Sequence, residues 1–256
     1  MVQKALTVKR STTRHLFDVN HLKEIKFENG KCYIGGAVTV TAFAESATIQ
    51  ALFPNLAKYI KLVSSTPIRN MATMAGNIVN ASPIGDMSIF FLALDSELLL
   101  NENGTKRTVS LRDFYKGYKQ IDKGPEEIIE QIIFSPPQND HFSFEKVCKR
   151  THLDIASVNS ACQLRLNNAG VIEKIHLSAG GVAPFPKYLA ATGTFLKDKT
   201  ISSEVLKEAI NIMNEEIAPI SDARGTADYK RLLLRQLFLA HFLDRPEIIK
   251  KVINIK

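Results

Sequence analysis

Residues 71–86, Met-Ala-Thr-Met-Ala-Gly-Asn-Ile-Val-Asn-Ala-Ser-Pro-Ile-Gly-Asp, carry almost no bulky polar or aromatic side chains. They lie between two strongly apolar stretches with helical spacing, residues 56–63 and 87–94. A segment so rich in small residues allows another molecule to approach its backbone closely. We therefore expect the functional site of the protein to be built around this segment.

The physical interpretation of the segment is a cradle for an anion. Gly76 permits close approach, and a helix that begins near Asp86 would present N–H groups without helical partners. Hydrogen-bonding side chains are supplied by Thr73, Asn77, Asn80 and Ser82. This chemistry suits a dinucleotide, although the segment is neither a Walker nor a Rossmann fingerprint. The alternative is a tight connection, with Asp86 as an ordinary N-cap after the turn residues Pro83 and Gly85.

A longer stretch, residues 66–86, resembles the second flavin-binding loop in the FAD subunits of molybdenum hydroxylases. That family includes xanthine dehydrogenase, nicotinate dehydrogenase and aerobic carbon monoxide dehydrogenase. The likeness rests on Ile-Arg-Asn at 68–70, Ala-Thr at 72–73, Gly-Asn-Ile at 76–78, Ser-Pro at 82–83 and then Asp86. It continues along almost the whole chain, at residues 144–150, 154–156, 179–184 and 221–231.

The resemblance implies a set of residues that bind FAD. The positions that match family contacts to the cofactor are Thr73, Gly76, Asn77, Asn80 and Asp86. Ile129 matches an apolar position beside the flavin, and Lys146 matches a lysine near the isoalloxazine ring. The alternatives are a core residue for Ile129 and a surface lysine at a strand start for Lys146. Ala75 replaces the first of two family glycines and adds little bulk.

The resemblance also implies an oxidoreductase subunit that is active only within a complex. A molybdopterin-binding subunit would hydroxylate the substrate, and a [2Fe-2S] subunit would relay the electrons. FAD on this chain would then pass them to NAD or another acceptor. The sequence has no Ser-His-Asp or paired-carboxylate signature, so we assign it no catalytic residue. The alternative is a cofactor-poor scaffold subunit of such a complex that has lost full FAD binding.

The front of the sequence departs from the family pattern. The family begins with a further strand and helix and a first glycine-rich flavin loop, whereas residues 1–4 resemble the segment just after that loop. We therefore expect a PCMH-type FAD-binding domain that is truncated at its start. Either the gene start is truncated, or a separate chain supplies the piece, or FAD is held weakly. The missing strand would expose a sheet edge.

Composition places the chain among ordinary globular proteins, with 256 residues, 45% apolar and 23% charged. It has no uninterrupted apolar run of the roughly 18 residues that a membrane helix needs, and its first residues are too polar for a signal peptide. We expect a cytoplasmic protein without a membrane partner. The net charge of +7 is spread along the chain without a recognisable DNA- or RNA-binding motif, so we expect no nucleic-acid partner.

The cysteines and histidines argue against an inorganic centre on this chain. Cys32, Cys148 and Cys162 are odd in number and have no C-x-x-C spacing, which favours reduced thiols. Three thiols cannot supply the four thiolates of an iron–sulfur cluster, and the six histidines lack metal-ligand spacing. We therefore expect neither a metal nor an iron–sulfur cluster here, and any redox centre would be organic.

Periodicity predicts an α+β chain that divides at Pro136-Pro137 into a FAD-binding domain, 1–136, and a C-terminal domain, 141–256. The second resembles the C-terminal domain of the carbon monoxide dehydrogenase flavoprotein, with an antiparallel three-stranded sheet packed with helices. Its predicted strands are 142–148, 155–166 and 171–179. In the first half we predict strands at 15–19, 31–40, 97–101, 107–111 and 126–134, and helices at 20–25, 41–52, 56–63 and 87–94.

Overall fold

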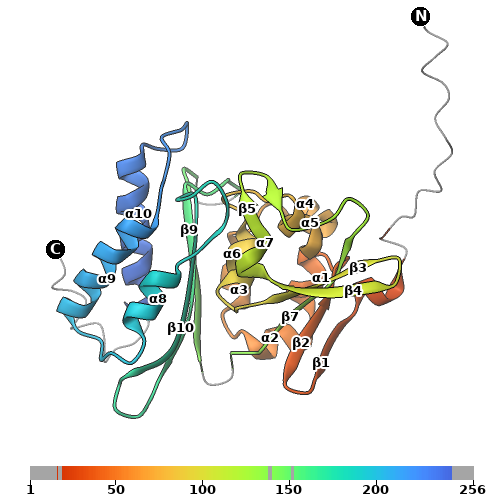
Figure 1. The fold of residues 1–256 in the computed structure, drawn as a ribbon, viewed down its shortest axis with the longest axis horizontal. Coiled ribbons are helices and arrows are strands. Elements are labelled where there is room, and N and C mark those ends of the chain that lie inside the picture. Colours follow the sequence, from red (N-terminus) through yellow and green to blue (C-terminus); the bar gives the residue numbers. More distant parts are fainter. Residues whose placement is uncertain (1–15, 17–18, 138–139, 151–152, 244–256) are drawn as a thin grey trace, which may run out of the picture.

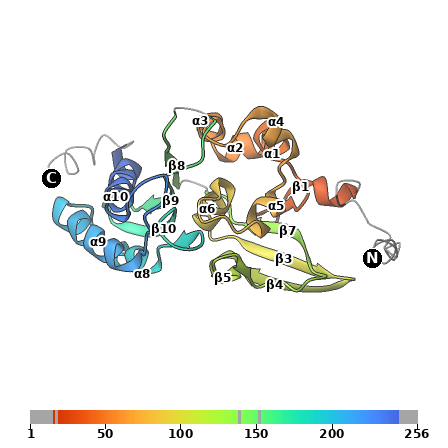
Figure 2. The same ribbon diagram turned by 90° about the horizontal axis from the view of Figure 1, so that it is seen from above.

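The computed structural model describes residues 16, 19–137, 140–150 and 153–243. In this part of the chain, two antiparallel sheets lie side by side, and helices cover the outer face of the second one (Figure 1). Helix α6 (Asp86–Leu92) lies between the two sheets, which is clearest from above (Figure 2). The α+β class is confirmed. Most of the strand predicted at 15–19 lies outside the described residues.

The first half of the chain forms a five-stranded sheet from β1 (Ile25–Glu28), β2 (Lys31–Gly35), β3 (Glu97–Glu102), β4 (Thr105–Ser110) and β7 (Ile128–Phe134). Across the sheet these strands lie in the order β1, β2, β7, β3, β4. The turn between β3 and β4 has positive φ at Asn103 and Gly104, as a two-residue type I′ hairpin requires. The predicted hairpin is thus confirmed, and β7 is the central strand.

The helices of this half are short. They are η3 (Asn20–Lys23), α1 (Val40–Glu45), α2 (Ala47–Leu52), α3 (Leu56–Lys61), α4 (Thr66–Met71), α5 (Met74–Val79), α6 and α7 (Leu111–Phe114). A small hairpin, β5 (Tyr115–Gly117) with β6 (Gln120–Ile121), follows α7. No described helix is long and apolar enough to span a membrane.

Two boundaries in this half were predicted wrongly. The strand predicted at 31–40 ends at Gly35, because Thr39 caps α1 by accepting a hydrogen bond from the Ala42 amide (3.1 Å). The helix predicted at 41–52 is two helices, because the Ser46 hydroxyl interrupts it and caps α2. The predicted helix began at Thr41, whereas α1 begins at Val40 and its N-cap is Thr39.

The segment 66–86 is not the loop that its composition suggests. It contains α4 and α5, each of six residues, and only residues 72–73 between them and 80–85 at its end are not helical. Asp86 is the first residue of α6 and not its N-cap, which is Gly85. Helices of this length bury few side chains, so they leave hardly any periodic signal in the sequence.

The second half forms the predicted antiparallel meander. Its strands are β8 (His141–Val147), β9 (Val158–Leu166) and β10 (Ile172–Gly180), and β11 (Lys187–Tyr188) adds a short fourth strand beside β10. The helices α8 (Ala190–Leu196), α9 (Ser203–Glu216) and α10 (Ala227–Leu243) cover one face. The predicted apolar face of α9, from Leu206 to Met213, is buried.

An aromatic cluster joins the two halves around α6. Phe90 of α6 packs against Phe142 of β8, with ring centroids 4.6 Å apart. The Tyr59 hydroxyl donates a hydrogen bond to the Phe142 carbonyl (2.7 Å), and the Ser178 hydroxyl donates one to the Ile89 carbonyl (2.7 Å). Because aromatic side chains bury large apolar areas, this cluster fixes the first half against the second sheet.

His241 of α10 makes the stability of the second half depend on pH. It is fully buried, with Nδ1 2.6 Å from the Ser143 hydroxyl and Nε2 2.9 Å from the Ser160 hydroxyl. Burial, with a smaller effect from the neighbouring His141, lowers the pKa of His241 to about 3. Since the unfolded chain then binds a proton that the folded chain does not, unfolding free energy is lost as pH falls from about 6.5 towards about 3.

We expect this histidine to contribute up to about 1.4 kcal/mol per pH unit over that interval. Urea titrations of the parent and of His241→Leu at a series of pH values would measure it. The variant should be less stable at neutral pH and should show a shallower acid slope. His21→Leu, at an exposed histidine, serves as the control. Parallel slopes for the parent and His241→Leu would contradict the assignment.

Candidate functional site

The start of α5 is held by hydrogen bonds within the chain. The Thr73 hydroxyl accepts a hydrogen bond from the Gly76 amide (3.0 Å), so Thr73 is the N-cap of this helix. The Met74 and Ala75 amides donate to carbonyls just after β2, those of Val38 (2.9 Å) and Gly36 (3.2 Å). The first N–H groups of α5 are therefore engaged, and what this helix offers a ligand is a surface of small side chains.

One face of α5 borders a cavity of about 390 Å³, which we call the Gly76 cavity. Three of the predicted residues, Thr73, Gly76 and Ile129, line it together. Its other walls include the small residues Gly36, Ala37 and Ala75. Ile129 is buried in β7 and presents an apolar surface to this cavity, so the core interpretation is correct, and its place beside a flavin stays a prediction.

Gly36 at the end of β2 is required by close packing. A Cβ atom on it would overlap the Ile129 carbonyl and would lie 3.2 Å from the Ala75 Cβ. A Cβ on Gly76 would lie 2.8 Å from the Thr73 hydroxyl oxygen, which is closer than real Cβ contacts. Both glycines therefore allow backbone segments to meet at the floor of the Gly76 cavity.

The other face of α5 borders a second cavity, of about 520 Å³, which we call the Asn77 cavity. It brings together Asn77, Asn80 and Asp86, with the hydroxyl groups of Ser64 and Ser65 on its wall. The Asn77 side-chain oxygen accepts hydrogen bonds from the Ser88 amide and hydroxyl, both at 3.1 Å. Asn77 thus accepts a hydrogen bond from one of the first N–H groups of α6. This corrects the expectation that the first N–H groups of α6 are unpaired.

Lys146 lies behind the Asn77 cavity and does not line it. It stands near the end of β8, and its side chain is 1% exposed, so it is not the surface lysine of the alternative interpretation. Its ammonium donates to an Asp86 carboxylate oxygen (2.8 Å) and to the Leu62 carbonyl (2.7 Å). Burial raises the pKa of Asp86, and the charge of Lys146 opposes that rise. The two residues form a buried ion pair.

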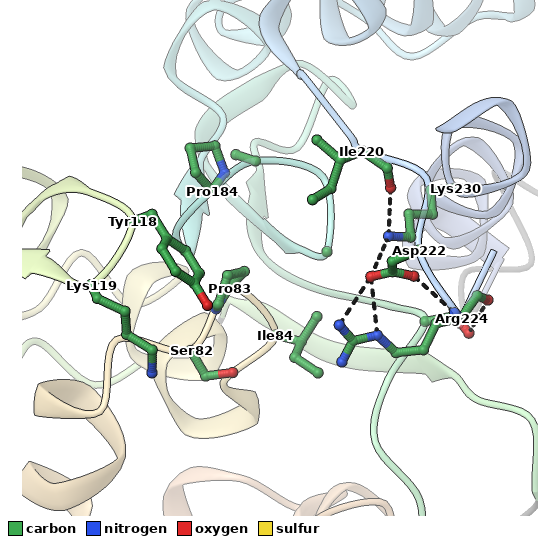
Figure 3. A pocket seen from close by; sticks show the side chains of 13 residues that line it. Ser82, Pro83, Ile84, Tyr118, Lys119, Pro184, Ile220, Asp222, Arg224 and Lys230 are labelled. Carbon is green, nitrogen blue, oxygen red and sulfur yellow. Dashed lines mark hydrogen bonds and ion pairs between the residues drawn. The ribbon is translucent and has the colours of Figure 1, made fainter. Parts of the chain in front are cut away.

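A third cavity, of about 630 Å³, lies between the halves, and we call it the interface cavity (Figure 3). The turn Ser82-Pro83-Ile84 forms one wall, and Tyr118 and Lys119 flank it on the first half. Lys119 also donates hydrogen bonds to the carbonyl and side chain of Asn80, which tethers it beside the Asn77 cavity. The interface and Asn77 cavities share Ser82 and Ile84.

The opposite wall of the interface cavity carries a charged cluster (Figure 3). Lys230 donates to the Asp222 carboxylate (3.0 Å) and the Ile220 carbonyl (2.8 Å), and Arg224 contacts the same carboxylate at 2.9 Å. Although burial acts in the opposite direction, these hydrogen bonds lower the pKa of Asp222, which stays ionised. Two cations share one anion there, so the cavity suits a ligand with negative charge.

The described residues contain no group of three or more His, Cys, Asp or Glu side chains arranged to hold a metal ion. Cys32 and Cys162 are buried free thiols, and Cys148 is a half-buried one. The polar groups that gather in this part of the chain are hydroxyls, amides and ion pairs around the three cavities. They fit an organic ligand.

Two family comparisons decide the identity. The family described as the FAD binding domain in molybdopterin dehydrogenase matches residues 2–137, and the CO dehydrogenase flavoprotein C-terminal domain matches residues 143–244. The chain belongs to this flavoprotein family. It is 27% identical over 235 residues to the glyceraldehyde dehydrogenase medium chain of Sulfolobus acidocaldarius, which covers 90% of this chain and 82% of that one.

Other relatives of this family member are dehydrogenases. It is 32% identical over 241 residues to the xanthine dehydrogenase of Blastobotrys adeninivorans, an alignment that covers 86% of this chain and 17% of that enzyme's length. The structure of Cu,Mo-CO dehydrogenase in its cyanide-inactivated form superposes with a TM-score of 0.81 at 27% identity, over 87% of this chain and 78% of that one. The molybdenum hydroxylase flavoprotein family predicted from residues 66–86 is therefore confirmed.

Several residues of this flavoprotein's site were not singled out from the sequence. Gly36 was interpreted as part of a strand and not as a cavity residue, and Tyr118 and Lys119 were passed over as a polar connection. Asn159 of β9 donates hydrogen bonds to the Ile84 carbonyl (3.2 Å) and to Asp86 (2.7 Å). Positions 158–164 also contain Ser160 and Gln163, so the polar character of Asn159 gave no signal that distinguished it.

Proposed function

We propose that this family member binds FAD through the residues expected from the sequence, namely Thr73, Gly76, Asn77, Asn80, Asp86, Ile129 and Lys146. The observation that carries the proposal is that six of them line two cavities on either side of the short helix α5, three in each. A dinucleotide cofactor has apolar rings and polar phosphate and ribose groups. It would find small apolar walls in the Gly76 cavity and amide and hydroxyl groups in the Asn77 cavity.

The residues fit the cofactor in a defined way. Gly76 is exposed between the two cavities, so the chain can be approached closely there. Ile129 would exclude water from an aromatic ring, and Asn77 and Asn80 would hydrogen-bond polar groups. Lys146 is paired with Asp86 behind the Asn77 cavity, so it would act on the cofactor by holding the Asp86 carboxylate in place. Bound FAD would supply the electron transfer itself.

We propose the interface cavity as the site of the electron acceptor, NAD or another anionic molecule. It touches the Asn77 cavity through Ser82 and Ile84, so a ligand in it would lie next to the proposed flavin. Tyr118 leaves 63% of its surface exposed at the rim and could stack on a planar ring. Lys119 and Arg224 would attract phosphate groups.

The Tyr118→Ala variant tests the acceptor site. We expect the KM for NADH reduction of bound FAD to rise about tenfold because a stacking contact of roughly 1–1.5 kcal/mol is lost, whereas flavin affinity should stay unchanged. Anaerobic bleaching of the visible flavin band would measure it. Tyr33→Ala, on β2 of the first sheet, is the control. An unchanged KM for NADH would contradict this assignment.

We also propose that a [2Fe-2S] subunit and a molybdopterin-binding subunit dock where apolar side chains are exposed around the Asn77 cavity. Ile68 of α4, Leu153 and Ile155 line this cavity and are 56%, 60% and 60% exposed, and Met71 on the same helix is 69% exposed. Exposed apolar side chains that gather at one site indicate a protein interface. A partner that covers this rim would sit beside the proposed flavin, as electron transfer requires.

The Ile68→Glu variant tests this docking surface, because Ile68 lines the Asn77 cavity and is exposed. We expect its association with the two partner subunits, measured by co-purification and light scattering, to weaken about tenfold because a charge is buried at the contact. The matched control is Phe27→Glu, which puts the same charge on an exposed apolar position of β1. Equal association of both variants with the partners would refute the proposed surface.

The alternative function, a scaffold subunit with little FAD, also has an observation in its favour. The amides of Met74, Ala75 and Gly76 are all engaged within the chain, so phosphates would depend on side chains and the exposed glycine. Retention of FAD separates the two functions. In either case we propose a cytoplasmic location, because free thiols at Cys32, Cys148 and Cys162 are typical of reducing compartments.

A further inference from the structure

The turn from Ser82 to Asp86 is the common wall of two cavities. Ser82 and Ile84 face both the Asn77 cavity and the interface cavity, and Asp86 belongs to the Asn77 cavity. The turn contains the Gly85 amide bonded to the Ser82 carbonyl (2.9 Å). If the flavin and its acceptor occupy the two cavities, the position of this turn determines how closely they approach.

The second sheet reaches into this turn through one side chain. Asn159 is fully buried in β9, and its amide nitrogen donates to the Ile84 carbonyl (3.2 Å) and to an Asp86 carboxylate oxygen (2.7 Å). Asp86 thus receives one neutral donor from Asn159 and one charged donor from Lys146, on different oxygens. The side-chain oxygen of Asn159 has no hydrogen-bond partner. A buried polar atom without a partner is costly, so the packing must hold this amide in place.

The packing around Asn159 is close enough to do so. A Cβ atom on Gly180 of β10 would overlap the Asn159 side-chain oxygen and would lie 2.9 Å from the Pro83 carbonyl. The Gly181 amide donates to that same carbonyl at 2.9 Å. Glycine at 180 therefore leaves the room that Asn159 occupies beneath the turn.

We propose that Asn159 is a positioning residue for the site, which fixes the Ser82–Asp86 turn and the Asp86 carboxylate without touching the flavin. The inference rests on the proposed function, which it deepens. An amide suits this place because both of its hydrogens are needed, one for the Ile84 carbonyl and one for Asp86. A carboxylate there would face Asp86 with no proton to donate.

Gln163 supplies an unusually close control. It lies on the same strand four residues further on, is also fully buried, donates through its amide nitrogen to Asp140 (2.6 Å), and likewise has a side-chain oxygen without a partner. Asn159→Leu and Gln163→Leu therefore each remove a buried hydrogen bond from β9 to a carboxylate, and only the first also removes the bond to the Ile84 carbonyl in the turn.

The experiment compares the two variants with the parent by hydrogen–deuterium exchange without flavin, by FAD titration followed through flavin fluorescence, and by the circular dichroism of bound flavin. In Asn159→Leu we expect faster exchange in the peptide spanning 80–90, about tenfold weaker FAD binding and an altered flavin spectrum. In Gln163→Leu these readouts should match the parent, although both variants lose similar stability.

If both variants bound FAD as tightly as the parent and exchange over 80–90 were unchanged, the proposal would be overturned. Equal weakening in both would overturn it too, because lost stability alone would then explain the effect. A parent chain that binds no FAD would reject the proposed function, and the exchange data would then decide alone. Faster exchange confined to 80–90 in Asn159→Leu would support the positioning role, and its absence would reject it.

Discussion

The Gly76→Asp variant should lose bound FAD, with at least about a hundredfold lower affinity, because several kcal/mol oppose a like charge placed beside phosphates. Two effects combine. Any Cβ atom at this position would lie 2.8 Å from the Thr73 hydroxyl oxygen, so the N-cap of α5 must shift. The new carboxylate would also stand at the exposed edge of the Gly76 cavity, where the phosphates of the cofactor would approach the glycine. Fluorescence titration with FAD measures the affinity directly.

A matched variant separates this local effect from the added charge. Ala47→Asp adds the same charge to the same half of the chain, at the exposed first residue of α2, where an acidic side chain is favourable. It should bind FAD like the parent. If Gly76→Asp retained the parent affinity, Gly76 would not contact the cofactor and the cavity beside it would have another purpose.

Replacing Lys146 with methionine should destabilise the fold by about 3–5 kcal/mol, because it leaves the buried Asp86 carboxylate without its cation. The Lys146 side chain is almost fully buried and Asp86 is 13% exposed, so water cannot replace the lost ammonium well. Urea denaturation measures the loss. Since burial raises the pKa of Asp86, the deficit of the variant should shrink as pH falls and the carboxylate gains a proton.

A second substitution tests the cause. In Lys146→Met combined with Asp86→Asn, the uncompensated charge is gone, and most of the lost stability should return, although FAD binding should not. The comparison also measures the role of Lys146 near the proposed flavin, because stability and affinity are read separately. If Lys146→Met alone were as stable as the parent at neutral pH, that result would contradict the buried ion pair.

The sequence allowed the strands to be predicted better than the helices. In residues 97–111, two strand-like runs flank Asn103-Gly104, and the turn chemistry of Asn-Gly indicates that hairpin. The meander from 142 to 179 was likewise visible in alternation. Helices α4 and α5 were missed, because six-residue helices built from small residues depend on tertiary hydrogen bonds such as those to Val38 and Gly36.

The residues of the candidate site likewise divide into those that could be predicted from the sequence and those that could not. The expected residues from Thr73 to Asp86 came from a resemblance that spans a continuous segment, and their division between two faces of α5 follows from helical spacing once the helix is known. Asn159 and Lys119 reach that segment from distant strands and loops, so no local pattern could reveal them. Whether the seven expected residues bind FAD remains a prediction.

The measurement that tests the central claim most directly is the visible absorption spectrum of the parent chain after it has been mixed with FAD and passed through a desalting column. If the cavities on the two faces of α5 hold the cofactor, the protein fraction will be yellow, with about one flavin per chain, and the Gly76→Asp fraction will be colourless. A colourless parent fraction, from protein that is folded by circular dichroism, would contradict the account and favour the scaffold function.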